Sequence, residues 1–217
     1  MIQCSPNGTR TVLCLGAHSD DIEIGCGGTI LKMAAECEEL TVWWVVFTAA
    51  GKRQAEAKAS ARMFLGRGVK AKIIIKQFRN GFFPFEGGRI KEFFEQLKGK
   101  VNPDVIFTHY RDDRHQDHRT ISDLTWNTFR NHFILEYEIP KYDGDLGAPN
   151  VFVTLDKGIC SRKTEYLCRF FQTQSNKHWF APETFLGLMR LRGMECASGT
   201  NYAEAFYSRK LVLGCAL

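Results

Sequence analysis

The chain has 217 residues, of which 44% are hydrophobic and 24% charged, and its formal net charge is +5. This composition is typical of a globular protein and excludes a disordered or fibrous chain, and the length suits one domain, which we place at residues 1–217. The charge is only mildly basic and the Lys and Arg residues form no compact run. We therefore expect no nucleic-acid partner, while an anionic small molecule remains compatible.

The apolar runs near the N-terminus are too short to enter a membrane. Thr11–Ala17 lacks the length and cleavage site of a secretion signal, and Thr41–Ala50 falls short of the roughly 20 residues that a spanning helix needs. We expect a cytoplasmic protein with no membrane span. The eight cysteines are scattered without a CxxC pair, which favours reduced cysteines in the core over a disulfide scaffold, with a cysteine nucleophile or zinc knuckle as the alternatives.

Apolar runs without polar alternation are followed by helical patterns along the chain, as expected for strands that are covered on both faces. The predicted strands are Thr11–Ala17, Leu40–Ala49, Ala71–Phe78, Asp104–His109, Phe133–Ile139, Val151–Leu155 and a last strand at Lys210–Gly214. The predicted helices are Gly28–Glu38, Arg53–Leu65, Arg89–Lys100, a segment from His118 to about Arg130, Ile159–Gln172 and Pro182–Arg192. This order predicts a single-domain, Rossmann-like α/β fold with a mostly parallel sheet between helices.

Two clusters of His and acidic residues follow the first and fourth predicted strands. The first contains His18, Asp20, Asp21 and Glu23, and the second contains Asp112, Asp113, His115, Asp117 and His118. Ligands of open α/β sheets bind at the carboxyl ends of the strands, so both clusters belong to the edge where a site is expected. His109, at the end of the fourth strand, lies on the same edge.

The residue types in these clusters suit a metal. Catalytic zinc takes three protein ligands from His, Asp and Glu, and keeps a fourth position open for water. Taken singly, a His at a strand end is usually a hydrogen-bonding surface residue, and an Asp such as Asp117 is often a helix cap. Two such clusters at one sheet edge favour the metal site.

The two clusters resemble the signatures of a known family. The segment AHSDDIEIGCGGTI is similar to the AHPDD-x-x-x-G-x-GG signature of the LmbE-like, or PIG-L-type, zinc N-deacetylases, and DRHQDHR is similar to their H-x-D-H motif. The resemblance continues through Arg53 and Glu56 (R-x-x-E), FRNG at 78–81 and YAEAF at 202–206, so that it spans essentially the whole chain. Such enzymes act on N-acetylglucosaminyl lipids, thiol precursors and other amino sugars.

The resemblance implies a role for each matching residue. It makes His18, Asp21 and His118 the ligands of one Zn²⁺ per chain, and Asp20 the general base. His115 becomes the group that stabilises the tetrahedral intermediate or protonates the leaving amine, with Asp117 orienting it. Arg53 and Asn80 are then candidate substrate-binding residues. The implied substrate is a small N-acetylated sugar, glycoside or nucleotide sugar, and the oligomeric state, including a homo-oligomer, is left open.

The sequence departs from the family pattern at three positions. Ser19 replaces the usual Pro, which should loosen the first loop slightly without touching a ligand. Asp113 stands where some members have a Tyr that assists the oxyanion, so that this assistance must come from elsewhere or be absent. Asn80 stands where many members have Asp, which leaves the recognition of sugar hydroxyls open.

Several other features have two interpretations. The glycines of GCGG lack a nucleotide-binding spacing and are better explained by tight turning and close packing. Arg53 and Glu56 form either a surface pair or a substrate contact. The phenylalanines of FRNGFFPFEGG serve as core or as a lid, and Glu204 reaches the site floor or forms a buried pair with an arginine.

Other functions are weaker interpretations of the same residues. An amidase that cleaves a larger thiol conjugate would use the same site. A non-catalytic sugar-binding module is disfavoured because every proposed ligand and Asp20 are present. A Rossmann-type oxidoreductase lacks its dinucleotide fingerprint.

Overall fold

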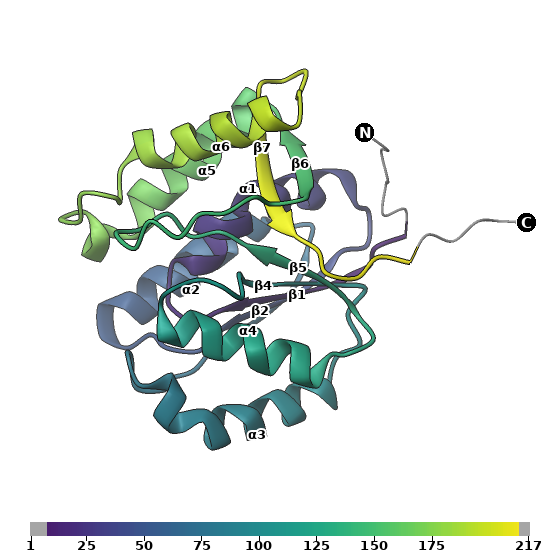
Figure 1. Ribbon diagram of the computed structural model, residues 1–217, viewed down its shortest axis with the longest axis vertical. Coiled ribbons are helices and arrows are strands. Elements are labelled where there is room, and N and C mark those ends of the chain that lie inside the picture. The colour runs from purple at the N-terminus through teal and green to yellow at the C-terminus, as the bar shows by residue number, and fades with distance from the viewer. Residues whose placement is uncertain (1–7, 213–217) are drawn as a thin grey trace, which may run out of the picture.

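The computed structural model describes residues 8–212, and its seven strands form one sheet in the order β3-β2-β1-β4-β5-β7-β6 (Figure 1). The strands are β1 (Thr11–Gly16), β2 (Thr41–Val46), β3 (Lys70–Ile75), β4 (Val105–His109), β5 (Phe133–Tyr137), β6 (Val151–Leu155) and β7 (Tyr202–Tyr207). The α-helices are α1 (Asp21–Glu36), α2 (Gly51–Leu65), α3 (Gly87–Lys98), α4 (Gln116–Thr128), α5 (Lys157–Phe170) and α6 (Pro182–Glu195). Two short 3-10 helices are η1 (Phe83–Glu86) and η2 (Gln172–Gln174).

The first five strands are parallel, and β7 runs antiparallel to both β5 and β6. The predicted mostly parallel α/β fold is therefore confirmed. Because β1 pairs directly with β4, with Val12 opposite Val105, the two loops that carry the His and Asp clusters leave the sheet side by side. Among residues 8–212, no helix has both the length and the apolar character required to cross a membrane.

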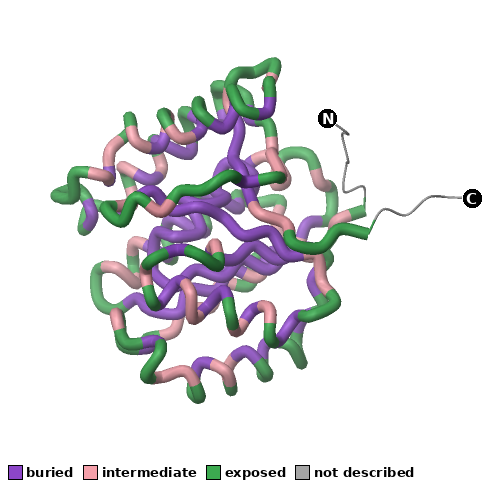
Figure 2. Tube along the Cα trace, viewed as in Figure 1, coloured by how far each residue is buried: buried purple, intermediate pink, exposed green. Residues whose placement is uncertain are grey.

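Helices cover both faces of the sheet. In Figure 1, α1, α2, α5 and α6 lie on one side of the sheet, and α3 and α4 lie on the other. Successive strand residues point to opposite faces, and β1 accordingly sends Val12 and Cys14 into the first core and Leu13 and Leu15 into the second. Figure 2 shows the buried sheet between more exposed helices. All six cysteines within the described residues are free.

Three predicted features differ from the structure. The first helix begins at Asp21 and not at Gly28, so that the glycine segment predicted as a turn lies inside it. The last strand is Tyr202–Tyr207, whereas residues 210–212 of the predicted strand form no strand and residues 213–214 lie outside the described residues. The edge strand β3 is also partly exposed, where coverage on both faces was expected.

Helix α1 is broken at Cys26, which has φ −141° and ψ 15°. The break leaves backbone groups without their usual helical partners, and buried side chains from other elements bond to them. Glu204 on β7 accepts hydrogen bonds from the backbone N–H groups of Gly28 and Thr29, at 2.7 and 2.6 Å. Lys163 on α5 donates to the carbonyl of Ile24 and to Glu204, both at 2.6 Å. Glu204 therefore pairs with a lysine and not an arginine, and it supports the helix that begins at the site.

The glycines of GCGG allow close packing. A Cβ on Gly25 would lie 2.1 Å from the Tyr137 ring, and one on Gly27 would lie 2.6 Å from Phe64. A Cβ on Gly28 would lie 2.9 Å from the carboxylate of Glu204. Close packing is therefore confirmed as their role, although the expected turn is a helix break.

Candidate metal centre

The first cluster is formed where the chain passes from β1 into α1. Three residues separate Gly16, the end of β1, from Asp20, and the N–H of His18 donates to Asp21 Oδ2 at 2.6 Å. Asp21 opens the helix, where a negative charge is favoured by the helix dipole. Asp20 occupies the N-cap position but makes no capping hydrogen bond with its side chain. The adjacent aspartates thus have different surroundings.

The second cluster is formed where β4 leads into α4. His109 ends β4, and His115 is the N-cap residue of α4, with its Nδ1 accepting a hydrogen bond from the N–H of Asp117 at 3.2 Å. Asp117 and His118 follow in the first turn of the helix and are buried. This turn places His118 against the first cluster.

The side chains of His18, Asp21 and His118 converge. His18 Nδ1 lies 3.1 Å from His118 Nε2 and 3.3 Å from Asp21 Oδ2, and His118 Nε2 lies 3.6 Å from Asp21 Oδ1. A tetrahedral zinc site with bonds of about 2.0–2.1 Å places its ligand atoms about 3.3 Å apart. The observed separations are close to this value, with the two histidines facing different oxygens of Asp21.

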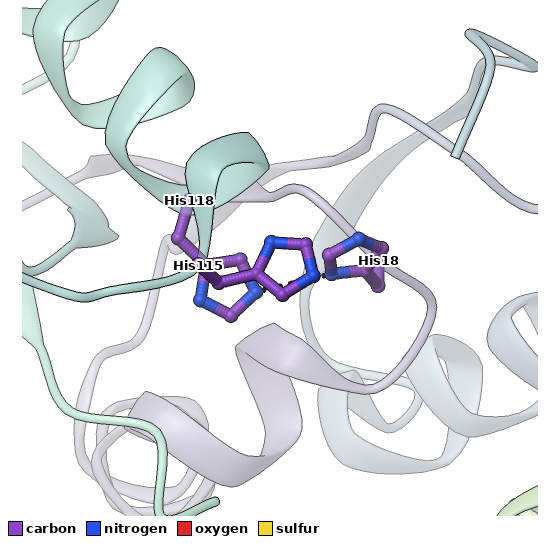
Figure 3. A group of neighbouring side chains, drawn as sticks. All are labelled: His18, His115 and His118. Atoms are coloured by element: carbon purple, nitrogen blue, oxygen red, sulfur yellow. Dashed lines mark hydrogen bonds between the residues drawn. The ribbon is translucent and has the colours of Figure 1, made fainter. Parts of the chain in front are cut away.

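Two overlapping sets within residues 8–212 bring ligand atoms within 4.8 Å of one another. One is His18, His115 and His118, drawn in Figure 3, and the other is Asp21, His109 and His118. His118 belongs to both sets. His109 was placed on this edge by its sequence position, but its contact with the centre was not predicted. Its Nε2 lies 3.1 Å from Asp21 Oδ2, and its ring stacks on that of His118 at 3.9 Å.

The charges at the centre favour a bound cation. Burial alone would lower the pKa of His18, but the carboxylates of Asp21 and Asp117 outweigh it and raise that pKa to about 9. Burial alone would raise the pKa of Asp21, but the imidazoles of His118 and His18 hold that pKa well below its usual range. Burial and the nearby Asp21 carboxylate raise the pKa of Asp20. The ionised carboxylates of Asp21 and Asp117 thus give the surroundings of His18 a negative charge, which a bound cation would also offset.

His118 has the properties of a neutral ligand. Burial and the neighbouring His109 lower the pKa of His118 to about 3, which leaves the lone pair of one ring nitrogen free. Its Nδ1 lies 2.9 Å from Asp113 Oδ2, which orients the ring so that Nε2 faces Asp21. A carboxylate behind a metal-ligating histidine is a common way to fix its tautomer. The residues present therefore fit a zinc ion.

Asp113, at the tyrosine position of some family members, is thus directed at His118. Lys141, in the segment between β5 and β6, lies 3.0 Å from the same Oδ2 atom and also pairs with Asp145. The N–H of His115 donates to Asp113 Oδ1 at 2.7 Å. Burial alone would raise the pKa of Asp113, but His118 and Lys141 outweigh this effect and lower that pKa below its usual range. Lys141 was not singled out in the sequence, because it lies in a turn-rich segment without a motif.

The Asp117 carboxylate bonds to the segment that precedes η1. It accepts hydrogen bonds from the N–H groups of Gly81 and Phe83, at 2.7 and 3.1 Å, and its Oδ2 lies 3.3 Å from His18 Nε2. Asp117 contacts His115 through its backbone N–H, whereas the resemblance implied an orienting role. Its carboxylate faces His18, and the orienting role towards His115 stays a prediction.

The remaining candidates lie around the centre. The Nε of Arg53 donates to Ser19 Oγ at 3.1 Å, and its Nη2 lies 3.5 Å from Asp20 Oδ1. Ser19 therefore takes part in a hydrogen bond that Pro could not make. Glu56 accepts hydrogen bonds from the N–H and hydroxyl of Thr173, so the R-x-x-E residues bind different partners. Asn80 is exposed beside the Gly81 backbone that holds Asp117.

Two acids of the sequence clusters do not join the centre. Glu23 is fully buried, and burial raises its pKa well above the usual range, which favours a neutral carboxyl. Asp112 is exposed. Of the aromatic segment, Phe83 is buried with its ring 6.2 Å from that of His18, while Phe82 and Phe85 are exposed. The core interpretation therefore holds for Phe78 and Phe83, and not for Phe82 and Phe85.

A mostly parallel sheet with a buried His/Asp centre at its carboxyl edge defines an α/β protein with a candidate metal site. Residues 13–129, more than half of the chain, match the PIG-L family model, described as GlcNAc-PI de-N-acetylase. The chain therefore belongs to the PIG-L family.

Solved structures share the fold over nearly the whole chain. The conserved protein TT1542 of Thermus thermophilus has a TM-score of 0.72 and 21% identity, covering 95% of this chain and 97% of that one. The N,N'-diacetylchitobiose deacetylase of Pyrococcus horikoshii has a TM-score of 0.69 and 21% identity, covering 93% and 84%. The 4-carboxy-2-hydroxymuconate hydratase GalB of Pseudomonas putida has a TM-score of 0.68 and 15% identity, covering 96% and 99%. Because one fold carries different activities, function must be argued from the site.

Proposed function

We propose that this chain is a zinc-dependent N-deacetylase that hydrolyses the acyl–nitrogen bond of an N-acylated amino sugar or amino-sugar glycoside. His18, Asp21 and His118 would hold the metal. The family's description supports deacetylation, and the 3.1–3.6 Å separations among the three side chains support the ligand set. When bound, zinc polarises the amide carbonyl and lowers the pKa of a water molecule towards about 7.

The observation that carries the proposal is that two adjacent aspartates, Asp20 and Asp21, have different surroundings. Both oxygens of Asp21 face imidazoles of the centre, while Asp20 lies at the helix N-cap without a capping bond. Asp20 is thus free to accept a proton from the attacking water, and Arg53, 3.5 Å away, holds its carboxylate in place. This contact assigns Arg53 a positioning role, while its partly exposed guanidinium remains within reach of substrate.

His115 is the least buried of the three histidines drawn in Figure 3. It is half-buried, and its ring centroid lies 4.8 Å from that of His18. We assign it to stabilising the tetrahedral oxygen or protonating the leaving amine. Hydrolysis adds water across the amide and yields the free amine and a carboxylate. We assign the exposed Asn80 to contacting sugar hydroxyls.

The test combines zinc content with amine release from N-acetylated sugars. Asp20→Asn should keep near-normal zinc and lose turnover by roughly 10²–10⁴, the range of a lost general base. Asp21→Asn should lose zinc, because a neutral amide is a poorer ligand than a carboxylate. His115→Ala should keep zinc and lose turnover.

Asp123→Asn on the exposed face of α4 is the matched control and should change neither quantity. If Asp20→Asn loses its zinc or keeps wild-type turnover, the roles assigned to the two aspartates are wrong.

A further inference from the structure

Ser19 links the first cluster of the candidate centre to helix α2. It lies between the proposed ligand His18 and the proposed base Asp20, and it is fully buried. Its Oγ accepts a hydrogen bond from the Nε–H of Arg53 at 3.1 Å. The family's usual residue here is Pro, which has no side-chain oxygen to accept such a bond. The contact is therefore a feature of this chain and not of the family pattern.

Two consecutive residues hold the Arg53 guanidinium at two different atoms. Nε bonds to Ser19, and Nη2 lies 3.5 Å from Asp20 Oδ1. Because the guanidinium is planar and rigid, a bond at Nε fixes the directions in which both Nη atoms point. The contact with Asp20 is longer than an ordinary hydrogen bond, so it is an ion pair that sets no direction by itself. The orientation of Arg53 towards Asp20 therefore depends on Ser19.

The stability of α2 does not explain why an arginine occupies position 53. Arg53 lies in the first turn of α2, where the helix dipole disfavours a cation, and no acidic residue in that turn offsets the charge. Glu56, three residues later, bonds instead to Thr173. Within residues 8–212, the hydrogen-bond and ion-pair partners of Arg53 are Ser19 and Asp20. The loop of the candidate centre therefore holds this guanidinium, and its own helix does not.

We propose that Ser19 is a positioning residue for the deacetylation, because it orients Arg53, which in turn holds the Asp20 carboxylate beside the attacking water. This inference rests on the proposed function. A general base acts only when it lies within hydrogen-bond reach of the proton that it accepts. A displacement of about 1 Å at a reacting group can cost about 10²-fold in rate. Loss of the Ser19 hydroxyl should therefore lower kcat more than it changes KM.

The test is a double-mutant cycle on the zinc-loaded full chain, with amine release from N-acetylglucosamine and N,N'-diacetylchitobiose as the measured reactions. Ser19→Ala should keep near-normal zinc and lower kcat by about 10–100-fold, with a smaller change in KM. Arg53→Met, which removes the guanidinium, should lower kcat by at least as much. The double variant should be no slower than Arg53→Met alone, because Ser19 then has no group to orient.

Two further variants separate the orientation of Arg53 from its charge and from the loss of any serine hydroxyl. Arg53→Lys keeps the charge but lacks the Nε–H that bonds to Ser19, so its kcat should fall about as far as that of Ser19→Ala. Ser198→Ala is the matched control. Ser198 Oγ also donates a hydrogen bond, to the Tyr202 carbonyl at 3.1 Å, but it precedes β7 at the sheet edge opposite the centre. Its kcat and zinc content should equal those of the wild type.

A second measurement tests the contact without turnover. In denaturant unfolding, the double variant Ser19→Ala with Arg53→Met should lose less stability than the sum of the two single losses. Non-additive unfolding with additive losses of kcat would overturn the inference, because the bond would then serve the fold alone.

Three other results would also overturn the inference and leave the proposed function standing. They are wild-type kcat in Ser19→Ala, wild-type kcat in Arg53→Lys, and loss of zinc from Ser19→Ala, which would place its effect on the metal. Absence of amine release from the zinc-loaded wild type would instead contradict the proposed function, on which the inference rests.

Discussion

Gly25→Ala should destabilise the protein, although the same change usually stabilises a helix. The new Cβ would lie 2.1, 2.4 and 2.8 Å from three atoms of the Tyr137 ring, where carbon atoms normally stay about 3.5–4.0 Å apart. The ring has little room to retreat, because Tyr137 is fully buried and its hydroxyl donates to the carbonyl of Leu15 at 2.6 Å. The change therefore forces either the ring or the helix to move.

The magnitude follows from three contributions. Overpacking a core costs about 1–3 kcal/mol, and the short contacts at Gly25 place this site at the upper end. Straining or breaking the buried Tyr137 hydrogen bond costs about 1–3 kcal/mol more. The higher helix propensity of Ala returns about 1 kcal/mol. We expect the free energy of unfolding to fall by about 3–5 kcal/mol.

Gly187→Ala supplies the control. Gly187 lies in the exposed interior of α6, and a Cβ there meets no atom within 4 Å. This variant should gain about 1 kcal/mol from propensity alone. Both variants are measured by denaturant unfolding with a chelator present, so that metal binding does not contribute. A midpoint for Gly25→Ala at or above that of the wild type would refute the packing argument.

The remaining predictions concern the supports of the centre and the metal itself. Asp113→Asn should weaken zinc affinity by about 10–100-fold, because it removes the carboxylate that orients His118; competition with a chelator measures this, and an unchanged affinity would contradict the role. Lys163→Met should lower the free energy of unfolding by about 3–5 kcal/mol, since it leaves Glu204 without its buried partner; a denaturant midpoint equal to that of the wild type would count against the pair. Chelation should abolish amine release and added Zn²⁺ should restore it, whereas full activity in protein shown to be metal-free would rule out metal dependence.

The sequence was sufficient to locate the candidate site because its position depends on topology. Apolar runs without polar alternation mark β1, β2 and β4, and the carboxyl ends of adjacent parallel strands must lie together. His18, Asp21 and His118 therefore converge as the two clusters suggested. The apolar strand runs and the His and Asp clusters behind them are both patterns of neighbouring residues, which a single sequence contains.

The parts that the sequence did not reveal depend on distant partners. Asp113 faces His118 partly because Lys141 pairs with it, and nothing near Asp113 in the chain indicates that pairing. The start of α1 was misplaced because glycine disfavours a helix, while Glu204 and Lys163 satisfy the broken backbone from other elements. The strand that carries Glu204 was missed for a related reason. A charged residue interrupts the apolar pattern of a buried strand, and the pairing of Glu204 with Lys163 cannot be seen in the local sequence.

The connection between Glu204 and α1 also gives the YAEAF segment a physical role in the site. Asp21 is the first residue of α1, and its direction is fixed by the short helical piece that ends at the break near Cys26. That piece is held at its carbonyl end by Lys163, and the next piece is held at its amide end by Glu204. Because one carboxylate binds both the lysine and the second piece, β7 sets the angle between the two halves of the helix. Residues more than 170 positions apart therefore act together to direct Asp21 at the two histidines.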